Sequence, residues 1–298
     1  MTYLRDAHVH VWSCNHSRYP LAAGFAPQDL WLPGFTPQDH ERIACAQLPM
    51  NLVQMTWYGL DHRYILDLIA ADPDRFVGTG VVPAICDVSL PRPDRAMLAL
   101  AQGGIRAFRL RGRAAQPPRE RATEEWLAHE SYERMFACAA DSGLALSFLC
   151  TPADLPEIGR MCTRFPQTTV ILDHCGGVRV RDSIIDVADL RLLTSLSGLP
   201  SVFVKFGPVH GLASRSTIPS VDSTGLIADV LPLLRATVDG FGAERVLWES
   251  DLGGPIHMLH AEHDFRRCVD LVLTADFLTP EQREQILGGN ARRLLWNR

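Results

Sequence analysis

Two histidines lie two positions apart in the segment Asp6-Ala7-His8-Val9-His10. Side chains alternate between the two faces of a β-strand, so Asp6, His8 and His10 would share one face, and Ala7 and Val9 the other. The two imidazoles would then lie about 7 Å apart along the strand, at roughly 3.3 Å per residue. Two imidazoles at this spacing can hold one metal ion or one substrate oxygen, so this segment is the first candidate for a reactive centre.

A histidine and an aspartate follow two later apolar runs. His174 comes directly after the run 170–173 and precedes a cysteine and a pair of glycines, which allow a ligand or another backbone to approach closely. Asp251 follows the run 246–248, where a carboxylate is costly unless it binds a cation, a histidine or a water that it activates. A loop carbonyl could instead satisfy His174, and Asp251 could instead cap a helix.

Other polar side chains in apolar segments are candidates for holding a substrate. Arg106 and Arg109 lie in one such segment, and a guanidinium group suits a carboxylate because it can donate two parallel hydrogen bonds. Lys205 ends another apolar run and could anchor an anion or pair with a neighbouring carboxylate, while Gln54 could donate a hydrogen bond to substrate. Two further arginines are more typical of a solvated loop: Arg111 and Arg113.

The remaining histidines and cysteines carry weaker signals. His257, His260 and His263 form a regular series that could capture a metal ion, although this spacing is more typical of surface or lid residues. The eight cysteines form no Cys-x-x-Cys pair, and most lie inside apolar segments. They indicate small core residues in a reducing compartment, with neither disulfides nor a zinc knuckle.

Eight short apolar runs alternate with longer segments in which apolar residues recur with the period of an α-helix. These runs and segments are the elements that must position the candidate residues. Threonine-proline pairs open several of the helical segments, at Thr36, Thr151 and Thr279, as a capping residue followed by proline at the first helical position. A strand followed by a helix, repeated eight times, predicts an α/β fold, a (β/α)8 TIM barrel, with residues 1–298 as a single domain. A doubly wound open sheet is the alternative, but it usually has a glycine-rich first turn, and none follows the first run. The predicted strands are residues 4–11, 51–57, 76–82, 104–110, 145–149, 169–173, 202–206 and 245–248.

Four of the predicted connections are long, and long loops in compact domains are usually functional. The first of them holds five aromatic residues and is expected to cover the barrel mouth as a partly apolar lid. These connections are residues 12–35, 111–125, 207–223 and 252–263.

The overall charge and the hydropathy pattern argue against a nucleic-acid-binding or membrane protein. The net charge is −5, from 29 Lys and Arg against 34 Asp and Glu, and offers no basic face for nucleic acid or an anionic membrane. No apolar run approaches the roughly 20 residues of a membrane-spanning helix, and the first ten residues lack the apolar core of a signal peptide. We expect a cytoplasmic protein that acts on a small molecule and that could form a homo-oligomer.

Taken together, these motifs resemble the amidohydrolase superfamily (amidohydrolase-related family 2). The resemblance spans nearly the whole chain and is strongest to the lactonase branch, which includes sugar-acid lactonases and 2-pyrone-4,6-dicarboxylate lactonase. It implies a (β/α)8 hydrolase whose site is built from His8, His10, His174 and Asp251, with Asp251 as general base toward water. The histidines would polarise the carbonyl under attack, directly or through one divalent ion. The motifs that carry the resemblance are Asp-x-His-x-His at 6–10, Asp-His-x-Gly at 173–176, Val204-Lys205, Ser250-Asp251 and Gly289-Asn290-Ala291-Arg292-Arg293-Leu294.

The chain also departs from this family. Binuclear amidohydrolases resemble one another in a lysine after strand four and a histidine after strand five, and both are missing here; Ser147 lies in the fifth predicted strand. A single-metal site would be left with His8, His10 and Asp251, with His174 as a further candidate ligand and zinc as the favoured ion. Because the strand-five ligand is missing, we expect weak or absent metal dependence, and a metal-dependent reaction is the alternative. The pyrone dicarboxylate enzymes carry two arginines where this chain has Gly177 and His210, so His210 becomes a candidate substrate-binding residue.

These expectations combine into one leading function with two alternatives. The leading one is hydrolysis of a small carboxylated or polyhydroxy lactone by a water that Asp251 activates, with Arg106 and Lys205 holding the anionic end. The first alternative is metal-dependent, non-oxidative decarboxylation of a small aromatic or unsaturated acid. The second is a barrel that only binds a metabolite or a partner protein. The site assignment requires His174 to lie within about 10 Å of His8, since one small substrate must touch both.

Overall fold

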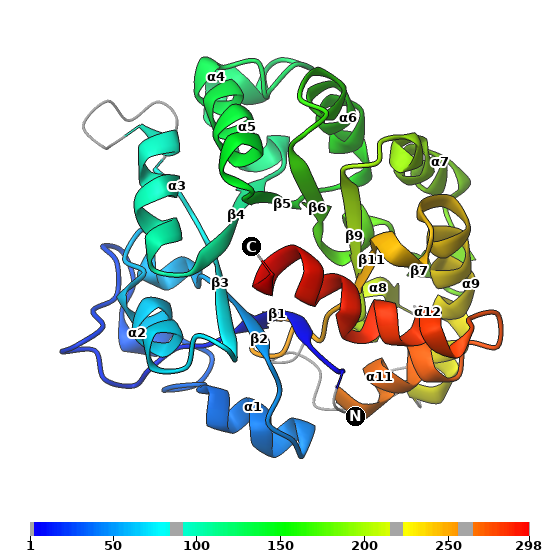
Figure 1. The fold of residues 1–298 in the computed structure, drawn as a ribbon, viewed down its shortest axis with the longest axis horizontal. Coiled ribbons are helices and arrows are strands. Elements are labelled where there is room, and N and C mark those ends of the chain that lie inside the picture. Colours follow the sequence, from blue (N-terminus) through cyan, green and yellow to red (C-terminus); the bar gives the residue numbers. More distant parts are fainter. Residues whose placement is uncertain (1–2, 84–91, 215–222, 256–264, 298) are drawn as a thin grey trace.

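The computed structural model describes residues 3–83, 92–214, 223–255 and 265–297, and its centre is a ring of eight parallel strands (Figure 1). Each strand is paired with the next one along the chain in the order β1-β2-β3-β4-β5-β6-β9-β11. All eight predicted strands are confirmed, as is the (β/α)8 barrel. The strands are β1 (Asp6–His10), β2 (Met50–Val53), β3 (Phe76–Gly80), β4 (Ile105–Arg111), β5 (Ala145–Leu149), β6 (Thr169–Leu172), β9 (Val202–Phe206) and β11 (Val246–Trp248).

Helices surround this ring, and none of those in the described ranges is long and apolar enough to cross a bilayer (Figure 1). The α-helices are α1 (Pro37–Ala44), α2 (Arg63–Ala71), α3 (Pro93–Gln102), α4 (Pro118–Arg121), α5 (Glu130–Ser142), α6 (Leu155–Arg164), α7 (Val187–Ser195), α8 (Val209–Leu212), α9 (Ser223–Phe241), α11 (Phe265–Leu273) and α12 (Pro280–Glu284). Short 3-10 segments are η1 (Pro27–Asp29), η2 (Thr56–Tyr58), η3 (Arg113–Ala115), η4 (Pro152–Asp154), η5 (Asp173–Gly177), η6 (Leu196–Gly198) and η7 (Ala243–Arg245). Two π-helical turns end the chain: η8 (Gln285–Gly289) and η9 (Arg292–Trp296).

The threonine-proline pairs begin helical segments as predicted. At α12 the Thr279 hydroxyl accepts a hydrogen bond from the Gln282 backbone, while the Gln282 side chain accepts one from the Thr279 backbone. Thr36 and Asp39 make the same reciprocal pair at α1. Both pairs satisfy backbone N–H groups that the first turn of a helix leaves without partners.

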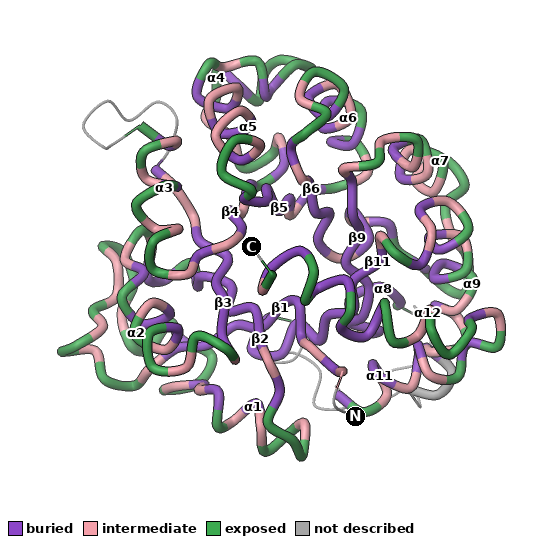
Figure 2. The backbone as a smooth tube through the Cα atoms, viewed as in Figure 1, coloured by how far each residue is buried: buried purple, intermediate pink, exposed green. Residues whose placement is uncertain are grey.

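The hydrophobic core has two parts, one between the barrel and its helices and one inside the barrel. In Figure 2 the buried residues concentrate along the strands of the ring. The inner part contains small or apolar side chains from seven strands, among them Ala107, Ala145 and Ile171. Ala291, Leu294 and Leu295 from the last turns of the chain complete it, and Figure 1 shows this segment crossing the middle of the ring. Because these residues fill one end of the barrel, only the other end, at the carboxyl ends of the strands, is open to a ligand.

The ring closes between β1 and β11 through contacts made just beyond β11. Val9 bridges Leu252, the His10 N–H donates to the Leu252 carbonyl (2.8 Å), and the Asp251 N–H donates to the His8 carbonyl (3.1 Å). The pairing of β1 with β2 shifts register between Asp6 and Val9, as in a β-bulge. This irregularity makes the predicted alternation wrong: Ala7 packs in the inner core, whereas Val9 packs in the outer core and Asp6 contacts His40 of α1.

Two features lie over or beside the open end. The connection 12–35 folds over it as predicted, with Trp12 buried and Trp31 41% exposed. A three-stranded sheet that the sequence did not predict joins β7 (Val180–Arg181), β8 (Ile184–Ile185) and β10 (Ala213–Ser214).

Candidate active site

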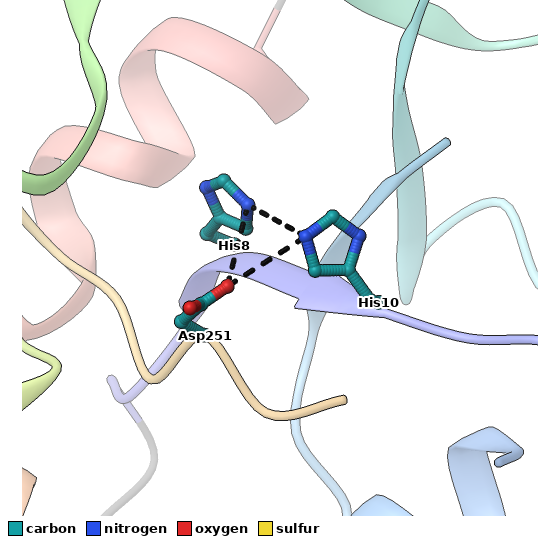
Figure 3. A group of neighbouring side chains, drawn as sticks. All are labelled: His8, His10 and Asp251. Atoms are coloured by element: carbon teal, nitrogen blue, oxygen red, sulfur yellow. Dashed lines mark hydrogen bonds and ion pairs between the residues drawn. The ribbon is translucent and has the colours of Figure 1, made fainter. Parts of the chain in front are cut away.

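His8, His10 and Asp251 converge at the open end of the barrel, at the seam between β1 and the segment after β11 (Figure 3). The Nε2 atoms of the two histidines are 3.2 Å apart. Asp251 Oδ1 lies 3.7 Å from His8 Nε2 and 3.6 Å from His10 Nε2. All three residues are buried, so these contacts are made out of water.

The surroundings of the two histidines differ at their Nδ1 atoms. His10 Nδ1 lies 3.0 Å from the Val53 carbonyl, which can only accept, so the neutral ring carries its proton on Nδ1. His8 Nδ1 faces both acceptors and a donor: Glu249 Oε2 at 3.2 Å, Asp173 Oδ1 at 3.7 Å and Lys205 Nζ at 3.2 Å. The His10 Nε2 lone pair then points toward His8 and Asp251.

Two imidazole nitrogens and a carboxylate oxygen that converge in this way can hold a cation. Among the described residues, Asp251 Oδ1 has no hydrogen-bond partner although it is buried. Tetrahedral zinc with bonds of about 2.0–2.1 Å separates its ligand atoms by roughly 3.3–3.4 Å, close to the three separations found here. The donor set also has the partners behind it that metal-ligating histidines usually have, a carbonyl and carboxylates. These residues therefore fit one divalent ion.

His174 lies beside His8 and adds a third imidazole to the site. It lies in η5, where His174 and Cys175 have left-handed backbone angles (φ 50° and 56°) that turn the chain sharply after β6. Its Nδ1 lies 2.8 Å from Glu249 Oε1, and its backbone N–H donates to the same oxygen (3.0 Å). The His8 and His174 rings are 4.9 Å apart, so the predicted proximity is confirmed.

The charges around the site shift its pKa values in different directions. Burial alone would lower the pKa of His174, but the Glu249 and Asp251 carboxylates outweigh it and raise that pKa to about 9, so the ring is held as the cation. Burial raises the pKa of Asp251, which makes it a stronger proton acceptor than an exposed aspartate. Burial and the neighbouring His8 hold the pKa of His10 well below its usual range, which keeps its ring neutral.

Lys205, which the sequence indicated as an anchor for substrate, is not among the described residues that line the cavity. It is fully buried, and its Nζ lies 2.9 Å from Asp173 Oδ1 and 3.2 Å from His8 Nδ1. Asp173 also accepts from the Ser147 hydroxyl (2.7 Å) and pairs with Arg109 Nε (3.2 Å). Burial alone would raise the pKa of Asp173, but the charges of Lys205 and Arg109 hold it well below its usual range. Lys205 is thus the partner of a buried carboxylate, which was the alternative role.

Three other predicted substrate-binding residues are not among the described residues that line the cavity. Arg106 lies on the outer side of β4, where its Nη1 donates to the Ala101 carbonyl of α3 (2.9 Å). Gln54 donates to the Gly59 and Asp61 carbonyls (3.1 and 2.8 Å) and so fixes the loop after β2. His210 lies on α8 and is not one of the described residues that line the cavity. Strand alternation explains the first error, because Ala107 and Arg109 face inward and Arg106 therefore faces outward.

A cavity of about 490 Å³ opens above the converging side chains. Arg109 lines it, as predicted for a substrate-binding residue. Glu249, which is buried between His8 and His174, was missed; a carboxylate inside an apolar run, just before Ser250-Asp251, was the signal for it. The histidines of the 257–263 series lie outside the described residues. The described lining residues are His10, Phe25, Asp29, Trp31, Met55, Thr56, Trp57, Arg109, Arg111, Leu149, His174, Arg179, Asp251 and Pro255.

Comparisons with known proteins agree with this architecture. The amidohydrolase family profile matches residues 6–295. An L-fucono-1,5-lactonase from Burkholderia ambifaria is 28% identical over 308 residues, which cover 98% of this chain and 94% of that protein.

Two solved structures share the fold at 20% identity. One is a Pseudomonas putida protein proposed to be a 2-pyrone-4,6-dicarboxylic acid hydrolase, with a TM-score of 0.73 over 99% of this chain and 98% of that chain. The other is an amidohydrolase from Burkholderia multivorans with bound zinc, with a TM-score of 0.69 over 98% of this chain and 99% of that chain.

Proposed function

The chain belongs to the amidohydrolase family, and from this premise we propose that it hydrolyses the ester bond of a small lactone. One observation carries the proposal: a buried carboxylate, Asp251, meets His8 and His10, with the His174 ring beside His8, at the floor of a cavity large enough for a small ring. The L-fucono-1,5-lactonase relative and the structural similarity to a proposed 2-pyrone-4,6-dicarboxylic acid hydrolase support lactones as the substrate class.

Asp251 is the proposed general base. Water attacks the lactone carbonyl carbon while Asp251 accepts a proton from that water. Burial raises the pKa of Asp251 and brings it closer to the pKa that suits a base at neutral pH. The bond between the carbonyl carbon and the ring oxygen then breaks, and the leaving oxygen takes up a proton to become a hydroxyl. The product is one open-chain molecule that carries a carboxylate and a hydroxyl group.

His174 is the proposed stabiliser of the negative charge that develops on the carbonyl oxygen. Its Nδ1 is engaged by Glu249 at 2.8 Å, so its Nε2–H is left for substrate. Glu249 fixes the ring and keeps it charged, and a charged donor in a buried site stabilises an oxyanion more strongly than a neutral one.

His8, His10 and Asp251 would hold a divalent ion, with zinc as the favoured metal. When bound there, the ion would supply Lewis-acid polarisation of the carbonyl. The Val53 carbonyl and Glu249, which contact the Nδ1 atoms of His10 and His8, would keep the two histidines oriented for such an ion. In a reaction without metal, the same histidines would act only as hydrogen-bonding groups.

The test is a product assay on purified protein. A panel of small lactones and aryl carboxylic acids is followed both for acid release by a pH indicator and for CO2 release. We expect acid release from at least one lactone and no CO2 from the acids. CO2 release without lactone opening would replace this proposal with decarboxylation, and activity on neither class would contradict both.

A further inference from the structure

The His8 ring contacts a hydrogen-bond donor at its Nδ1 atom. Lys205 Nζ lies 3.2 Å from this nitrogen and 2.9 Å from Asp173 Oδ1, so the lysine is an ammonium group that a carboxylate neutralises. An ammonium group has three N–H donors and no acceptor, so it can bond to a ring nitrogen only through the lone pair of that nitrogen. In the neutral ring that satisfies this contact, the proton of His8 is on Nε2.

The other end of the His8 ring favours the same tautomer. His8 Nε2 lies 3.2 Å from His10 Nε2, and a hydrogen bond between the two nitrogens needs one proton (Figure 3). His10 carries its own proton on Nδ1, beside the Val53 carbonyl (3.0 Å), so His10 Nε2 can only accept. The proton between the rings therefore belongs to His8. One line of hydrogen bonds then runs from Lys205 through His8 and His10 to Val53.

The carboxylates near His8 Nδ1 favour the opposite tautomer but are not placed for it. Glu249 Oε2 lies 3.2 Å from Nδ1, yet this oxygen makes no hydrogen bond within the described ranges, so it is out of line with a proton on Nδ1. The other oxygen of Glu249 accepts from His174. Asp173 Oδ1 lies 3.7 Å from Nδ1, beyond hydrogen-bond distance. Lys205 is thus the partner of Nδ1 that has hydrogen-bond geometry.

The position of this proton decides whether His8 can bind a metal ion. A metal bonds to an imidazole nitrogen through its lone pair, and in this tautomer His8 Nε2 has none to offer. Zinc at His8, His10 and Asp251 would require the proton to move to Nδ1, where Glu249 Oε2 is the nearest acceptor. The hydrogen bond from Lys205 would then be lost, and its loss would lower the affinity for zinc.

We propose that Lys205 is a positioning residue that holds His8 in the tautomer with the proton on Nε2 and thereby weakens the binding of a divalent ion. Lys205 and His8 are both fully buried, so water does not compete for their hydrogen bond. This role is distinct from the ion pair that Lys205 makes with Asp173. The inference goes beyond the proposed function, because it concerns the ring and the ion and holds whatever the substrate is.

Nuclear magnetic resonance of the wild type tests the tautomer without any variant of Lys205. The 11 histidines are labelled with 15N, the protein is treated with chelator, and the signals of His8 are identified by their loss in His8→Gln. The 15N chemical shift of a ring nitrogen separates a protonated nitrogen from one with a lone pair. We expect a proton on Nε2 and a lone pair on Nδ1. A proton on Nδ1, or on both nitrogens, would overturn the inference.

Zinc affinity of the chelator-treated protein tests the effect of Lys205 on the ion. Competition with a chromophoric chelator compares the wild type with Lys205→Met and Arg109→Met. Arg109→Met is the matched control, because Arg109 Nε also pairs with Asp173 (3.2 Å) and its loss removes the same charge without a hydrogen bond to His8. We expect Lys205→Met to bind zinc about tenfold or more tightly than the wild type, as for the loss of one hydrogen bond from a charged group. Arg109→Met should gain less and keep the wild-type tautomer.

Equal gains in the two variants would show that Lys205 acts only through its charge, and unchanged zinc affinity in a folded Lys205→Met would show that it does not act on the ion; either result overturns the inference. Lys205→Arg keeps a charged donor and should restore the wild-type tautomer. None of these measurements depends on lactone opening. The expected tautomer in a protein that opens no lactone would refute the proposed function alone, and the other tautomer in an active lactonase would refute this inference alone.

Discussion

The carboxylate of Asp6 ties Ser250 to the strand that carries His8. Asp6 Oδ1 accepts from the backbone N–H groups of Ser250 (3.0 Å) and His8 (3.1 Å), and Asp6 Oδ2 accepts from the Ser250 hydroxyl and faces His40 Nε2 (3.1 Å). This carboxylate lies where β1 and β11 share few backbone hydrogen bonds. It therefore holds together the two chain segments that supply His8 and Asp251.

Replacing Asp6 should weaken the contacts between β1 and the segment that follows β11. Asp6→Asn keeps the size of the side chain but removes the charge and replaces one acceptor oxygen by a donor, so the free energy of unfolding should fall by about 1–3 kcal/mol. Activity should fall as well, because His8 and Asp251 lose their fixed relative position. Denaturant unfolding and kcat measure the two effects. Asp74→Asn, at an exposed carboxylate before β3, is the control, and equal behaviour of the two variants would refute the role.

Lys205 gives a prediction that separates its two candidate roles. Lys205→Met leaves Asp173 buried with Arg109 as its remaining cationic partner, and breaking a buried pair costs about 3–5 kcal/mol. We therefore expect a lower melting temperature. If Lys205 instead anchored the substrate, the variant would keep its stability and show mainly a raised KM.

Glu249 should act through His174. Glu249→Gln keeps an acceptor for the ring but removes the charge that holds it as a cation, so kcat should fall by about 10²-fold while KM changes less. Steady-state kinetics with a lactone substrate measures both constants. A kcat close to that of the wild type would show that the anchored ring is not needed for the chemical step.

Metal binding can be measured apart from activity. Zinc at about 100 times its dissociation constant should stabilise the chelator-treated wild type by about 2.7 kcal/mol, seen as a higher melting temperature. His10→Ala should lose this response, and His16→Ala, at a histidine in the lid connection, should keep it. An unchanged melting temperature for the wild type, together with full activity in chelator, would favour catalysis by the histidines alone.

The sequence predicted the barrel well because its signals are local. Apolar runs mark the eight strands, and threonine-proline pairs mark helix starts, so neither requires knowledge of distant contacts. His8, His10, His174 and Asp251 were predictable for a related reason: each follows or ends an apolar run, and parallel strands bring their carboxyl ends to one edge.

The errors came from features that sequence patterns do not encode. The bulge in β1 moved Ala7 to the barrel interior, although strict alternation placed it with Val9. A polar residue in an apolar run can face substrate, a helix or a buried partner, and only the structure separates Arg109 from Arg106 and Lys205. Arg111 and Arg179 lie near loops, where the sequence does not indicate which side chains turn toward the cavity.

The most direct test of the account is the kcat of Asp251→Asn on a lactone that the wild type opens. Asparagine keeps the shape of the side chain and cannot take the proton from water, so kcat should fall by about 10²–10⁴-fold. Calorimetry with the open-chain product of that lactone checks in parallel that the cavity still binds a ligand. A fall in kcat of this size with binding retained is the predicted result, and retention of more than about a tenth of the wild-type kcat would contradict the role of Asp251 as the base.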